Sequence, residues 1–159
     1  MFWFKKVVFT NYAHFSGRAR RKEYWMFYIT YFFIALCLSA LIGVLGGGGV
    51  ILLRIFFLLL LIPAAAVTIR RFHDTGRSGW WLIPYWFMNP LITTVVYIPI
   101  HQVADSGSPT LIIKGIYITS ILLFLVSLVF LLLNSQPGHN WWGPSPKEVE
   151  QNRISNFGL

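Results

Sequence analysis

The sequence predicts an all-α membrane protein with four transmembrane helices and both termini in the cytoplasm. Of its 159 residues, 56% are hydrophobic and 11% are charged, whereas ordinary soluble domains carry about 25% charged residues. The mean hydropathy is +0.63, and the apolar residues gather in four stretches long enough to cross a bilayer. The formal net charge is +8 at pH 7. In so apolar a chain, this surplus favours an anionic membrane surface over nucleic acid as the partner.

The first two spans are predicted to form an antiparallel hairpin. Residues 24–45 contain no charged side chain and meet the length of about 20 residues that a spanning helix needs. Four glycines, 46–49, then allow the chain to turn back into a second span, 50–69. Pro63 and the three alanines after it predict a kinked helix with a close-packing face. Arg54 lies near the start of this span, where its side chain can reach the headgroups.

The other two spans differ in regularity. The third, 80–100, contains three prolines, each of which removes a helical amide donor, so neighbouring groups must satisfy the freed carbonyls. The fourth, 111–133, is the most hydrophobic of the four, and its Lys114 can reach the headgroups. The predicted organisation is a basic segment 1–23, a bundle 24–133 and a tail 134–159.

The basic residues predict the orientation. Eleven of the thirteen lie before the first span, in the loop 70–79 or in the tail: Lys5, Lys6, Arg18, Arg20, Arg21, Lys22, Arg70, Arg71, Arg77, Lys147 and Arg153. The positive-inside rule therefore places both termini and this loop in the cytoplasm. Four acids share that side, so its net charge is 11 minus 4, or +7.

The beginning of the chain predicts an interfacial helix. Residues 1–12 combine large apolar side chains with two lysines and contain no acid. Phe2, Trp3, Val7 and Val8 are then available to the acyl boundary, and the lysines to the headgroups. The alternative is that the lysines serve only as ordinary topology signals.

Three polar patches lie on the predicted cytoplasmic side. The first patch (15–25) reads F-S-G-R-A-R-R-K-E-Y-W, the middle patch (70–81) reads R-R-F-H-D-T-G-R-S-G-W-W, and the third patch (138–146) reads G-H-N-W-W-G-P-S-P. Together, and in this order, they closely resemble a small bacterial inner-membrane family of unknown function, number 805 among such families. The resemblance covers nearly the whole chain. It implies a multi-span protein of the bacterial inner (plasma) membrane and implies no established activity. His14 and the last dozen residues depart from the family pattern.

The middle patch contains more arginine than its one carboxylate can neutralise. If the second helix continues for a turn beyond the membrane, Asp74 comes within ion-pairing reach of Arg70, Arg71 and Arg77. Thr75 and Gly76 would then end the helix. The patch is either a charged hinge that fixes the topology or a site for an anionic headgroup or partner, because guanidinium groups suit phosphate oxygens.

The other patches are expected to meet the middle one. Arg18 and Arg21 are three residues apart, and Arg20 is spaced to pair with Glu23. In the simpler interpretation these arginines are juxtamembrane anchors. Asn140 and the tryptophans after it either fold back onto the bundle or lie along the headgroups. If the patches converge, the aspartate of the middle patch is their shared partner.

Metal binding, catalysis and transport each have weaker support. Three histidines and one carboxylate on the predicted cytoplasmic side could in principle bind a metal: His14, His73, Asp74 and His139. They lack the close spacing of metal ligands, and the nearby arginines would repel a cation. Adjacent residues such as His73 and Asp74 point in different directions on a helix, and no paired nucleophile is evident. Ion-coupled carriers place charges near the centres of their spans. Here Asn89, Ser127 and the prolines are the only polar features at such depth.

We therefore expect a structural or accessory membrane protein with a basic cytoplasmic face. The expected partners are the bilayer, its anionic phospholipids, and a membrane-protein partner or a second copy of the chain. A small transporter is the first alternative and a lipid-modifying enzyme the second. No catalytic residue, metal ligand or cofactor is predicted. The predicted lipid- or partner-binding residues are Arg18, Arg21, Arg70, Arg71, His73, Asp74, Arg77 and Asn140.

Overall fold

The computed structural model describes residues 2–45, 47–86 and 109–156, and these contain helices and no strand. The elements are α1 (Phe2–Lys5), the π-helix η1 (Lys6–Thr10), α2 (Arg21–Leu45), α3 (Gly47–Asp74), the 3-10 helix η2 (Gly79–Trp81), α6 (Pro109–Leu132) and α7 (Pro146–Asn156). They belong to two compact units. Unit 1 is Met1–Gly79 with Asn134–Leu159, and unit 2 is Trp80–Leu133.

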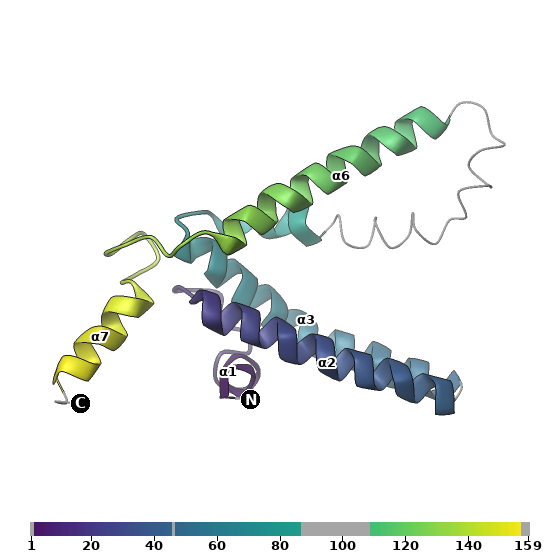
Figure 1. Cartoon of the computed structure of the whole chain (residues 1–159), viewed down its shortest axis with the longest axis horizontal. Coiled ribbons are helices and arrows are strands. Elements are labelled where there is room, and N and C mark those ends of the chain that lie inside the picture. The colour runs from purple at the N-terminus through teal and green to yellow at the C-terminus, as the bar shows by residue number, and fades with distance from the viewer. Residues whose placement is uncertain (1, 46, 87–108, 157–159) are drawn as a thin grey trace. The chain divides into compact units, whose positions relative to one another are not determined.

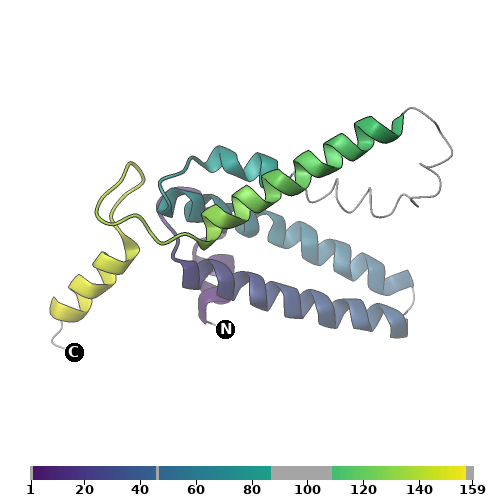
Figure 2. The same cartoon turned by 45° about the horizontal axis from the view of Figure 1, so that its top comes forward.

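The first two predicted spans form an antiparallel hairpin in unit 1, where α2 and α3 lie side by side (Figures 1 and 2). Arg21–Leu41 and Ile51–Asp74 are each long and apolar enough to cross a membrane. The prediction that the whole glycine run is a turn is wrong, because α3 already begins at Gly47. Backbone groups in hydrocarbon need partners, and a helix supplies them even where glycine is a poor helix former.

Pro63 lies inside α3 and is fully buried. Because proline has no amide hydrogen, the carbonyl of Leu59, four residues earlier, loses its helical donor. The Tyr12 hydroxyl supplies a replacement, donating a hydrogen bond of 2.7 Å to this carbonyl. The alanine face after the proline is also buried, with Ala64 7% and Ala66 0% exposed.

Removing the Tyr12 hydroxyl should leave the Leu59 carbonyl of α3 without a donor. Tyr12→Phe is expected to lower the free energy of unfolding by about 1–2 kcal/mol, the cost of leaving a carbonyl of a membrane-spanning helix without a donor. The variant Pro63→Ala restores an amide donor to Leu59, so Tyr12→Phe should cost much less in that background. Thermal unfolding in detergent measures both, and an equal cost of Tyr12→Phe in the two backgrounds would contradict this explanation.

The N-terminal helix packs onto the hairpin. Phe4 of α1 stacks on Phe27 of α2, with 5.5 Å between the ring centroids. Val7 is fully buried, so the expectation that it faces the acyl boundary is wrong. Phe2 and Phe9 are 70% and 78% exposed. One side of the segment formed by α1 and η1 therefore packs within unit 1, and another side exposes aromatic rings.

Unit 2 contains the predicted fourth span, which forms α6. Ile121–Leu132 is an apolar helical stretch within it. Trp81 meets Phe130 edge to face, with ring centroids 4.9 Å apart, and Tyr85 stacks on Phe124 at 5.7 Å. Of the predicted third span, η2 and the helical residues 82–86 are described. The rest of that span lies outside the described residues.

The tail contains one regular helix, α7, which begins at Pro146. Proline is well tolerated in the first turn, where its missing amide hydrogen would have no helical partner. The preceding residues, 134–145, form turns that return the chain to the end of α3.

Candidate functional site

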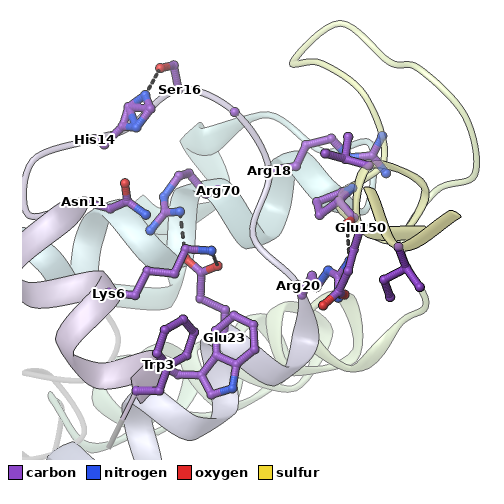
Figure 3. Close-up of a pocket in the computed structure, with 15 residues that line it drawn as sticks. Trp3, Lys6, Asn11, His14, Ser16, Arg18, Arg20, Glu23, Arg70 and Glu150 are labelled. Carbon is purple, nitrogen blue, oxygen red and sulfur yellow. Dashed lines mark hydrogen bonds and ion pairs between the residues drawn. The ribbon is translucent and has the colours of Figure 1, made fainter. Parts of the chain in front are cut away.

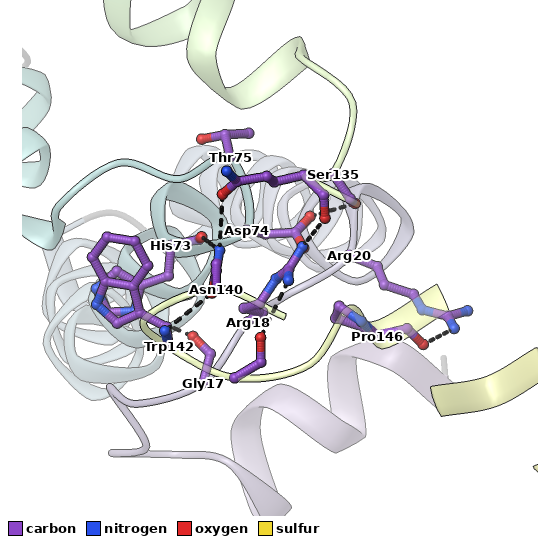
Figure 4. A network of polar contacts seen from close by, with 12 residues as sticks. Gly17, Arg18, Arg20, His73, Asp74, Thr75, Ser135, Asn140, Trp142 and Pro146 are labelled. Atoms are coloured by element: carbon purple, nitrogen blue, oxygen red, sulfur yellow. Dashed lines mark hydrogen bonds and ion pairs between the residues drawn. The ribbon is translucent and has the colours of Figure 1, made fainter. Parts of the chain in front are cut away.

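Asp74, the last residue of α3, is the centre of a buried polar cluster. Its Oδ1 accepts a hydrogen bond of 3.1 Å from Arg18 Nε, and its Oδ2 accepts from Arg71 Nη1 and, at 2.5 Å, from the Ser135 hydroxyl. The side chains of Arg18, Arg71 and Asp74 are between 0% and 1% exposed. We call these four residues the Asp74 cluster, and Figure 4 shows Arg18, Asp74 and Ser135 of it. It joins the first patch, the middle patch and the chain after α6.

The other N–H donors of the Arg18 guanidinium bind main-chain carbonyls of the tail. Its Nη1 donates to the carbonyls of Gly138 at 2.8 Å and Gly143 at 3.2 Å, and its Nη2 donates to the carbonyl of Gln136. The amide of Gln136 in turn donates to the carbonyl of Asp74 at 2.8 Å. The planar fork of the guanidinium can meet all these acceptors at once, which an ammonium group cannot.

The third patch folds back onto the end of α3. Asn140 Nδ2 donates to the carbonyl of His73 at 3.0 Å, and the Trp142 ring stacks on the His73 imidazole with 4.6 Å between centroids. His73 Nδ1 lies 3.2 Å from the carbonyl of Gly17 in the first patch. Trp141 is 97% exposed. Of the two expected arrangements for this patch, the structure shows the one that folds back.

A second polar cluster lies around Glu23 in the first turn of α2. Its carboxylate accepts from Lys6 Nζ at 3.0 Å and from Arg70 Nη1 at 2.8 Å. Glu23 and Arg70 are 3% and 5% exposed at the side chain, and Lys6 is 38% exposed. We call these three residues the Glu23 cluster. The expected pair of Arg20 with Glu23 is wrong, because Arg20 binds Glu150 and the carbonyl of Pro146 instead.

A cavity of about 550 Å³ adjoins the Glu23 cluster (Figure 3). Its polar lining includes Lys6, Glu23 and Arg70, and Phe2 and Trp3 of α1 add apolar surface. The first patch, α7 and the residues Asn11 and His14 contribute the rest of the wall. The volume falls within the range of about 300–1,000 Å³ that is typical of small-ligand sites.

The predicted site residues thus divide into groups. Arg18, Arg71 and Asp74 share one cluster, and Asn140 and His73 pack beside it. Arg70 belongs to the Glu23 cluster. Arg21 is partly buried and Arg77 is exposed. Among the described residues, no three His, Cys, Asp or Glu side chains gather into a metal site.

The Asp74 cluster lies within the part of the chain that matches a known family. A family model described as "Protein of unknown function (DUF805)" matches residues 12–144. The chain belongs to the DUF805 family. This confirms the resemblance drawn from the three patches, all of which lie within the match except the end of the third. α1, η1 and α7 lie outside it.

Two relatives extend the comparison. The chain is 33% identical to the inner membrane protein YhaH of Escherichia coli K12 over 151 residues, which are 92% of this chain and 98% of YhaH. It is 37% identical to the inner membrane protein YhaI of the same organism over 99 residues, 61% of this chain and 83% of YhaI. Both names give a membrane location and no activity. No solved structure matches the chain.

Four residues that belong to the two clusters or contact them were not among the predicted site residues: Lys6, Glu23, Ser135 and Gln136. A signal for Glu23 exists in the sequence, because it is the only acid in the first 73 residues and stands among many cations. A single carboxylate among many cations is expected to pair with more than one of them. Gln136 offers no comparable signal, since its role depends on where the tail folds.

Proposed function

We propose that the protein is a four-span inner-membrane protein with a structural or accessory role, whose basic cytoplasmic face binds anionic phospholipid or an acidic protein partner. The observation that carries the proposal is the charge of unit 1. Its sequence contains all eleven basic residues of the predicted cytoplasmic side. Exposed members of this set include Lys5, Lys22, Arg77 and Lys147. Each Lys or Arg near an anionic surface contributes about 1 kcal/mol of attraction.

The two polar clusters give the face a structural basis. The acids Glu23, Asp74 and Glu150 neutralise buried or partly buried cations, while several basic side chains remain at the surface. The inner-membrane location of YhaH and YhaI supports the same location for this chain. Both termini and the loop 70–79 then lie in the cytoplasm, as the positive-inside rule requires.

Cysteine accessibility tests this topology. In a Cys37→Ser background, a cysteine introduced at Ser78 should be protected from an impermeant external reagent, because the loop is cytoplasmic. Cysteines at Gly48 and Ser106, on the opposite side, should be labelled. Permeabilised cells give the control for reactivity. If the cysteine at position 78 is labelled in intact cells while those at positions 48 and 106 are protected, the orientation is the reverse of the proposed one.

Lipid retention tests the basic face. Protein in neutral detergent should retain phosphatidylglycerol in preference to phosphatidylcholine, and the preference should weaken with salt because exposed charges are screened. Native mass spectrometry can measure the bound fractions. A Lys5→Gln, Lys22→Gln double variant should lose about tenfold or more of the preference, from two charges of about 1 kcal/mol each. Equal retention of both lipids by the unmodified protein would remove the lipid proposal.

A further inference from the structure

The Arg70 guanidinium has donors that the protein does not use. Its Nη1 binds Glu23, but its Nε and Nη2 are buried and have no hydrogen-bond partner among the described residues. The side chain is only 5% exposed. Buried donors on a charged group are costly when unsatisfied, and an arginine offers five N–H groups in a fixed fork. The cluster therefore has unused capacity for an acceptor.

The charge of the Glu23 cluster is also incomplete. One carboxylate is shared by Lys6 and Arg70, which approach it from two sides in Figure 3. The other arginines of the cavity lining also contact acids, since Arg20 binds Glu150 and Arg18 shares Asp74 with Arg71. One positive charge consequently remains at Lys6 and Arg70. An anion is the ligand that would balance it.

The residues that line the cavity indicate which class of anion it can bind. Trp3 lies beneath Lys6, whose Nζ is 5.2 Å from the centre of the indole ring, and exposed Phe2 adjoins it. The cavity thus has a cationic wall beside an aromatic one. Such a combination suits a phosphate ester with an attached organic group, because Arg binds phosphate oxygens through parallel hydrogen bonds and aromatic side chains favour the headgroup region.

We propose that this cavity is a phosphoryl-binding site, in which Arg70 and Lys6 hold the oxyanion and Glu23 competes with it for both cations. The inference rests on the proposed function and deepens it from a diffuse basic face to a defined site. Because Nε and Nη2 are covered, binding requires Lys6 or Arg70 to change rotamer. The phosphoryl group comes either from an anionic phospholipid headgroup or from a free phosphate ester.

The test compares four variants in neutral detergent, with thermal unfolding recorded for each. Arg70→Gln should weaken binding about tenfold or more by removing charge-assisted hydrogen bonds. Arg70→Lys keeps the charge and loses the fork, so it should also bind weakly. Glu23→Gln removes the competing carboxylate and should strengthen binding about fivefold. Lys22→Gln is the charge-matched control, because this exposed lysine does not line the cavity. It should weaken phosphatidylglycerol retention only by the diffuse contribution of one charge, about fivefold, and should leave glycerol 3-phosphate binding unchanged.

Two probes distinguish the source of the phosphoryl group. Phosphatidylglycerol retention is measured by native mass spectrometry, and glycerol 3-phosphate binding by calorimetry. The site is supported if one of these ligands binds more weakly to the Arg70→Gln and Arg70→Lys variants and more tightly to the Glu23→Gln variant. The ligand that responds in this way identifies the source of the phosphoryl group. A loss of stability in Glu23→Gln without tighter binding overturns the site. Retained phosphatidylglycerol preference that is the same in Arg70→Gln and Lys22→Gln overturns the site but leaves the diffuse basic face, whereas no preference in the unmodified protein removes that face.

Discussion

Asp74→Ala is expected to lower the free energy of unfolding by about 3–5 kcal/mol, the usual cost of removing one partner of a buried ion pair. The carboxylate is fully buried and holds two arginines whose side chains are almost wholly buried. Without it, both guanidiniums keep their charge and lose their counterion. Thermal unfolding in detergent, extrapolated to a common temperature, measures the loss.

Glu150→Ala is the matched control for this substitution. Glu150 also pairs with an arginine, but its side chain is 55% exposed. Exposed ion pairs contribute about 0–1 kcal/mol, so this variant should unfold close to the unmodified protein. If the two alanine variants are equally stable, Asp74 is not the centre of a buried cluster.

Arg18→Lys is expected to cost about 2–4 kcal/mol although it preserves the positive charge. Lysine has one ammonium group and cannot reach both Asp74 and the three tail carbonyls that Arg18 contacts. The tail should therefore detach more readily, which limited proteolysis of residues 134–156 can detect. Arg77→Lys is the control, because Arg77 is exposed, and it should change stability by less than about 0.5 kcal/mol. Equal protection of the tail in both variants would contradict the role given to Arg18.

Hydropathy was sufficient to predict the long helices of the hairpin and α6. The first predicted span, 24–45, differs from α2 by three residues at its start. The second span was predicted to end at residue 69, and a further helical turn was considered only as a condition for ion pairing by Asp74. α3 contains this turn, and Arg71 pairs with Asp74 three residues away. These features depend on local composition and helical periodicity, which a sequence displays directly.

The partners of the other charges depend on contacts between distant segments. Arg20 precedes the first residue of α2, so helical spacing does not place it beside Glu23. Arg77 follows Gly76, whose φ of +74° takes the chain out of the helix, and helical spacing from Asp74 no longer applies. The link from Tyr12 to Leu59 was also absent from the sequence analysis. Pro63 indicates that a carbonyl loses its donor but does not indicate which distant group replaces it.

The central claim is that the first and middle patches, far apart in the sequence, join in one buried cluster around Asp74. A double-mutant cycle between Arg18 and Asp74 tests it most directly, using Arg18→Gln, Asp74→Asn and their combination. Both substitutions remove the charge and keep a polar side chain. Because the two residues are 56 positions apart and joined at 3.1 Å, we predict a coupling energy of at least about 1.5 kcal/mol, with the double variant more stable than additivity allows. A coupling energy within about 0.3 kcal/mol of zero would contradict the cluster.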